Sequence, residues 1–137
     1  MTEFVKLNQG WNAEPNTPIP QVKLIKSNLE LHFFLNPYQF ENYNEGDKGC
    51  IEFSNCSRFR FTDINDEAWY KGECRFSKLA PSWGEFYLVQ RNFKEQENAT
   101  PWQHHAQKDT TLDNFLFYFR DSTFECSAKS WSFKLVT

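Results

Sequence analysis

The chain has 137 residues, a mass of 16.4 kDa and a net charge of −3, from 15 basic and 18 acidic side chains. A pI near 5.6 excludes nucleic acids and anionic membrane surfaces as expected partners, because both are bound by basic surfaces. The unbroken apolar runs are too short to span a bilayer. A chain of this length, with 15 Phe, 5 Tyr and 5 Trp, predicts one globular β domain over residues 1–137.

Alternation of apolar and polar residues with period two dominates the chain and predicts strands. In chain order, strands are expected at 4–8, 21–26, 29–36, 50–54, 58–62, 69–76, 83–90, 114–120 and 123–129, with the last alternation extended through residue 135. Asp121 and Ser122 are turn residues between two of these segments, which predicts a C-terminal hairpin.

Two polar segments and one helix separate the strands. Residues 11–20 contain three prolines and predict an extended loop, and residues 36–48 predict a second loop. Thr100, Pro101 and Gln103 occupy the N-cap, N1 and N3 positions of a capping box, which predicts a short helix from Pro101 to about Lys108. The expected fold class is all-β, an antiparallel sandwich or a partly closed β-barrel of about eight or nine strands with one short helix.

Motifs of common enzyme classes are absent from the sequence. The five glycines never adopt GxGxxG or GxxxxGK[ST] spacing, and there is no GxSxG, HExxH or CxxC. We therefore nominate no catalytic residue, no metal ligand and no cofactor, although carboxylate pairs that are distant in sequence escape this test.

His104 and His105 attract attention because they follow Trp102 in the predicted helix. Adjacent helical side chains point about 100° apart, so the two imidazoles are poorly placed to chelate one metal. We favour an interpretation in which Trp102 anchors the helix and both histidines are solvated. In the alternative, one histidine is a general base or a single metal ligand in a cleft beside Trp102.

Charged side chains of both signs occupy the polar faces of the expected strands. The favoured interpretation is a solvated sheet face with cross-strand ion pairs. In the alternative, a partly desolvated carboxylate close to an arginine, Glu73, Glu85 or Glu125, binds a polar ligand, and Glu85 is carried forward as a candidate site residue. The polar positions that motivate both interpretations are Glu52, Arg58, Arg60, Lys71, Glu73, Arg75, Glu85, Tyr87, Tyr118, Arg120, Glu125 and Lys129.

Tryptophans supply the remaining candidates for a binding surface. Trp11, Trp69, Trp83 and Trp102 lie in or beside predicted loops or strand ends, where an aromatic ring can contact a ligand or a protein partner. The competing interpretation is that they close the ends of the β core.

The N-terminal segment lacks the basic and apolar regions of a secretory leader, so we expect a cytoplasmic protein with reduced cysteines. The expected function is non-enzymatic binding through protein–protein interaction, as in an inhibitor or an immunity-type partner. The alternative is a small-ligand-binding β-barrel with a Phe-lined cavity. A third hypothesis is a barrel enzyme that uses His104 or His105 and a carboxylate.

Overall fold

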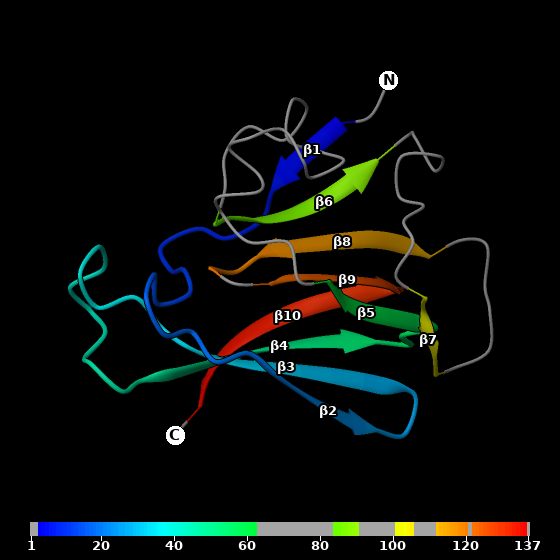
Figure 1. Cartoon of the computed structure of the whole chain (residues 1–137), viewed down its shortest axis with the longest axis horizontal. Helices are drawn as coiled ribbons and strands as arrows, with labels where there is room; N and C mark the ends of the chain where they lie inside the picture. The colour runs from blue at the N-terminus through cyan, green and yellow to red at the C-terminus, as the bar shows by residue number, and fades with distance from the viewer. Residues whose placement is uncertain (1–2, 63–83, 91–100, 106–111, 121, 137) are drawn as a thin grey trace.

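A computed structural model of the chain describes residues 3–62, 84–90, 101–105, 112–120 and 122–136. Ten strands in these ranges form two antiparallel sheets, which pack as a sandwich and do not close into a barrel (Figure 1). The described ranges contain no helix, and hence none that is long and apolar enough to cross a membrane. The predicted all-β antiparallel fold is confirmed, and of the two architectures left open by the sequence the structure has the sandwich.

Six strands form the first sheet, and every neighbouring pair in it is antiparallel. Their order across the sheet is β1 (Glu3–Lys6), β6 (Phe86–Gln90), β8 (Asp113–Tyr118), β9 (Thr123–Ala128), β5 (Arg58–Thr62) and β7 (Gln103–His104). The hairpin between β8 and β9, in which Phe117 lies opposite Phe124, confirms the predicted C-terminal hairpin.

The second sheet has four strands in the order β10 (Ser130–Val136), β4 (Lys48–Ser54), β3 (Asn28–Phe34) and β2 (Gln21–Ile25). The alternation that runs from residue 123 to residue 135 is therefore two strands, β9 and β10, which belong to different sheets. Lys129 lies between them, and its amide donates to the Ser54 carbonyl at 2.9 Å. The chain crosses from one sheet to the other at this residue.

Aromatic rings from both sheets fill the space between them. Phe53 of β4 lies 5.2 Å from Phe115 of β8, and Phe33 of β3 lies 5.3 Å from Phe117 of β8, measured between ring centroids. Trp11, in the loop after β1, stacks on Phe133 of β10 at 4.1 Å with an interplanar angle of 5°. Ring-to-ring packing of this kind is how a sandwich fills its interior with side chains.

The outer face of the six-stranded sheet is also buried. Tyr87, Leu116 and Tyr118 are each 1% exposed. On this face the Arg60 Nε donates to Glu125 Oε2 at 2.6 Å, and both side chains are buried. The expectation of a solvated charged face is therefore wrong for Arg60 and Glu125, because their strands are central and covered rather than edge strands.

The helix predicted over Pro101–Lys108 is also wrong within the described residues. Residues 101–105 contain no helical residue, and Gln103 and His104 form β7, which pairs with Phe59 and Arg58 of β5. Helix formation over so few residues is marginal, so pairing with a neighbouring strand outweighs the local capping signal. Residues 106–108 and the strand predicted at 69–76 lie outside the described residues.

Gly49 of β4 provides a test of the core. A Cβ built on Gly49 would lie 2.7 Å from a ring carbon of Phe133 and 2.9 Å from Leu35 Cδ2. Because Phe133 is held by its stack on Trp11, we expect Gly49→Ala to lower the free energy of unfolding by about 1–3 kcal/mol. Chemical denaturation measures this change. Ser132→Ala, on the exposed face of β10, is the control and should change stability by less than about 0.5 kcal/mol.

Candidate functional site

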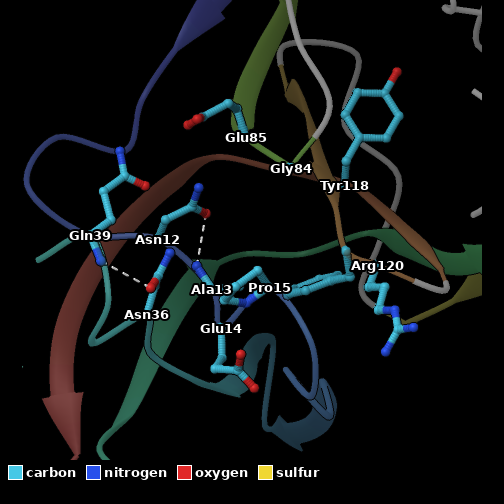
Figure 2. Close-up of a pocket in the computed structure, with 11 residues that line it drawn as sticks. Asn12, Ala13, Glu14, Pro15, Asn36, Gln39, Gly84, Glu85, Tyr118 and Arg120 are labelled. Carbon is cyan, nitrogen blue, oxygen red and sulfur yellow. Dashed lines mark hydrogen bonds between the residues drawn. The ribbon is translucent and has the colours of Figure 1, made fainter. Parts of the chain in front are cut away.

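Two loops meet at one end of the sandwich and surround a pocket. They are the connections between β1 and β2 and between β3 and β4. The residues just before β6 and those at the end of β8 complete the wall (Figure 2). The pocket has a volume of about 310 Å³. Residues 12–15, Asn36, Gln39, Gly84, Glu85 and residues 118–120 line it.

Backbone hydrogen bonds fix the two loops to each other. The Asn36 amide donates to the Asn12 carbonyl at 2.9 Å, and the Glu14 amide donates to the Phe34 carbonyl at 2.8 Å. An isolated β-bridge joins Ala13 to Leu35. These loops therefore continue the sheet pairing beyond β3, so the pocket wall is ordered although sequence analysis predicts only loops.

Glu85 lies in this pocket, and Asn8 sets its position. Glu85 Oε2 accepts a hydrogen bond from Asn8 Nδ2 at 2.6 Å and lies 3.5 Å from Lys6 Nζ. The Glu85 side chain is 18% exposed. Asn8 also donates to the Trp11 carbonyl and accepts from the Phe86 amide. Asn8 is a buried residue that sequence reasoning missed, because a lone asparagine at a strand end has no distinctive signal.

Asn12 and Asn36 supply amide donors to the pocket. Asn12 Oδ1 accepts from the Ala13 amide at 2.7 Å, and Asn36 Oδ1 accepts from the Tyr38 and Gln39 amides. Both side chains use their oxygen for the backbone in this way, so Nδ2 is the group through which each could bind a ligand in the pocket.

Glu14 and Arg120 form the opposite wall. Glu14 accepts hydrogen bonds from the Asn16 amide at 2.9 Å and from the Thr17 amide at 2.7 Å, and also from the Thr17 hydroxyl. Burial alone would raise the pKa of Glu14, but these hydrogen bonds and the nearby Arg120 outweigh it and lower the pKa. Arg120 Nη1 donates to the Asn16 carbonyl at 3.0 Å.

A second, more apolar depression of about 420 Å³ adjoins the pocket and shares Glu14 with it. Its other lining residues are Asn16, Thr17, Ile19, Phe34, Leu35, Pro37, Tyr38, Glu45 and Gly46. Ile19 is 56% exposed and Tyr38 is 68% exposed. Ile19 also has a φ of 44°, a conformation that is unfavourable for a β-branched residue. We call Ile19, Phe34, Pro37 and Tyr38 the loop surface.

The structure separates the tryptophans nominated from the sequence. Trp11 is 5% exposed and belongs to the core, in contact with Phe33 and Phe133, which matches the competing interpretation for this residue. Trp69 and Trp83 lie outside the described residues. Trp102 is partly buried and stacks against two guanidinium groups, with Arg58 Cζ at 4.0 Å and Arg60 Cζ at 3.9 Å from the ring centroid.

His104 and His105 lie at the opposite end of the sandwich from Glu85. They follow Trp102 and flank the start of β5, whereas Glu85 precedes β6 (Figure 1). His104 is exposed, and the His105 amide donates to the Ser57 carbonyl at 2.8 Å. The fold therefore does not bring either imidazole to the Glu85 carboxylate as an acid–base pair.

A further cluster that sequence reasoning missed lies on the outer face of the four-stranded sheet. His32 Nε2 is 2.9 Å from Glu30 Oε1 and 3.7 Å from Cys50 Sγ, and the three side chains together could hold a metal ion. Alternation places Glu30 and His32 on one face, but the register that sets Cys50 opposite His32 is not visible in the sequence.

Comparison with known proteins gives no match for this chain among protein-family models, curated proteins or solved structures.

Glu14 provides a test of how the pocket wall is held. Hydrogen bonds in the folded state lower the pKa of Glu14 below its ordinary value of 4.5. The carboxylate therefore stabilises the fold at any pH above 4.5, and this stabilisation is lost as the pH falls through the pKa of the folded state. We expect Glu14→Gln to reduce stability by about 0.5–1.5 kcal/mol at pH 7. Denaturation at pH 7 and pH 3 should show that the difference from the wild type shrinks in acid. A difference that stays constant with pH would contradict this role of the carboxylate.

Proposed function

We propose that the protein is a non-enzymatic binding module that contacts a protein partner through the loop surface and the adjacent pocket. The observation that carries the proposal is Ile19, a β-branched residue with positive φ and a side chain that is 56% exposed. Such backbone strain persists only where the surrounding structure imposes it, and it is concentrated at functional sites.

The chemistry of this end of the molecule fits a protein interface. Interfaces combine exposed aromatic and aliphatic anchors with a polar rim, and energetic hot spots are enriched in tyrosine. Tyr38 and Ile19 supply the anchors, and the polar pocket with Glu14, Glu85 and Arg120 lies beside them. Because this pocket has both donors and acceptors, it suits a polar side chain or backbone segment of the partner.

A cytoplasmic location is part of the proposal, and the cysteines support it. Cys50, Cys56 and Cys126, the cysteines that the structure describes, are buried free thiols. Buried free thiols suit a reducing compartment.

A second candidate function is binding of a small polar molecule in the pocket beside Glu85. Its volume of about 310 Å³ lies at the lower limit of known ligand pockets, and the Asn12 and Asn36 amides converge on it. The Phe-lined cavity of the barrel hypothesis has less support, because Phe33, Phe53, Phe115 and Phe117 contact one another between the sheets.

The loop surface is tested with the double variant Ile19→Asn and Tyr38→Ala. Asparagine tolerates positive φ better than isoleucine, so the fold should be retained while both apolar anchors are removed. The wild-type chain is immobilised, partners are isolated from the cells that produce it, and the affinity of the purified partner is then measured. We expect the double variant to bind at least tenfold more weakly, because hot-spot side chains typically contribute more than about 1–2 kcal/mol.

Leu24→Ala is the matched control. Leu24 is an apolar side chain of β2 that is 46% exposed, and it pairs with Leu29 at the start of β3, whereas Tyr38 follows the end of β3. Its substitution should leave the affinity unchanged. If the double variant bound the partner as tightly as the wild type and the control, the loop surface would not be the interface.

A further inference from the structure

The Glu30–His32–Cys50 cluster has the geometry of a site for one metal ion. Glu30 and His32 are two residues apart on β3 and therefore share a face, and Cys50 is the cross-strand partner of His32 on β4. The three ligand atoms lie within 4.8 Å of one another. Two sides of the triangle formed by these atoms are 2.9 and 3.7 Å, and the third is at most 4.8 Å. The point equidistant from the three atoms is then no more than about 2.4 Å from each of them. This distance is close to Zn–S and Zn–N bond lengths of about 2.3 and 2.1 Å.

The contacts also argue against a thiol–imidazole catalytic relay. In such a relay the histidine contacts its two partners through different ring nitrogens. Here the Glu30 carboxylate and the Cys50 thiol both approach Nε2 of His32. Three ligand atoms gathered around one ring nitrogen fit a shared ion better than a proton relay.

The surroundings of the cluster suit a divalent ion. Cys50 is fully buried and Glu30 is 9% exposed, so water competes little with an ion for these two ligands. When a divalent ion binds, the thiol proton is released to solvent, and the carboxylate and thiolate together neutralise the charge of the ion.

Charged side chains of β4 and β10 lie beside the cluster. Lys134 of β10 lies 3.9 Å from Glu30 Oε2, which is not the oxygen nearest His32, and its side chain is 61% exposed. From this position the ammonium group can orient the carboxylate as an outer partner. Glu52 of β4 adds a negative charge near Cys50. A depression of about 230 Å³ borders His32, with Gln21, Phe34 and Lys48 in its wall, and has room for a water molecule or a small ligand.

We propose that Glu30, His32 and Cys50 form a binding site for one zinc-class ion, with three protein ligands and a fourth position open to solvent. A set of one thiolate, one imidazole and one carboxylate favours Zn²⁺ or Co²⁺ over Mg²⁺ and Ca²⁺, which prefer oxygen ligands only. The three ligands lie on the four-stranded sheet, and the depression beside His32 shares Ile19 and Phe34 with the loop surface.

The experiment uses the full-length protein, purified without metal and titrated with Zn²⁺ in a calorimeter and with Co²⁺ in an absorption spectrometer. We expect one equivalent of either ion to bind and Co²⁺ to show a thiolate charge-transfer band. Cys50→Ser should abolish this band, and Cys50→Ser and His32→Gln should each weaken Zn²⁺ binding at least tenfold. His104→Gln, which alters an exposed histidine of the other sheet, is the matched control and should leave binding unchanged.

Two results would overturn the proposal. One is the absence of stoichiometric binding to the wild type, and the other is a Zn²⁺ affinity or Co²⁺ band that persists when both His32 and Cys50 are substituted. Circular dichroism establishes whether each variant folds. If Cys50→Ser does not fold, His32→Gln decides the outcome, because His32 is 27% exposed and its substitution leaves no buried cavity.

Discussion

The stack between Trp11 and Phe133 is the contact on which the loop end of the sandwich depends. It joins the loop after the first strand to the last strand, at 4.1 Å and nearly parallel planes. Gly49 makes room for it, because a side chain at that position would collide with the Phe133 ring. With Trp11 fixed, its carbonyl holds Asn8, and Asn8 in turn positions Glu85. A polar pocket is thus built outward from an aromatic contact in the core.

The outer faces of the two sheets have different roles. On the six-stranded sheet the outer face is buried, and the side chains of both Arg60 and Glu125 are removed from water there. Breaking this ion pair would leave a buried charge without its partner, which is costly. On the four-stranded sheet the outer face has charged side chains that reach solvent, including His32 and Lys134. Polar groups able to bind a ligand or an ion therefore lie on the loops and on the smaller sheet.

Local alternation predicted most of the strands, because burial of one face imposes a period of two on segments such as 29–35 and 114–119. It did not predict which strands are neighbours, so the Arg60–Glu125 pair and the position of Cys50 opposite His32 could not be foreseen. The capping box at Thr100 predicted a helix because it reads only local sequence, whereas β5 offers Gln103 and His104 a strand to pair with. Trp11 illustrates the same limit, since a loop position does not reveal whether a ring points inward.

The topology of the four-stranded sheet also bears on the order in which the fold is completed. Strands β2, β3 and β4 of this sheet are consecutive in the chain, but β4 gains its other neighbour only when β10 is added. Pairings between such distant segments form late, because a long loop must close before any contact is gained. On the ribosome, the N-terminal loop would lack the ring that seats Trp11 until β10 had been synthesised. The stack that completes the loop end would therefore form only after β10 has been synthesised.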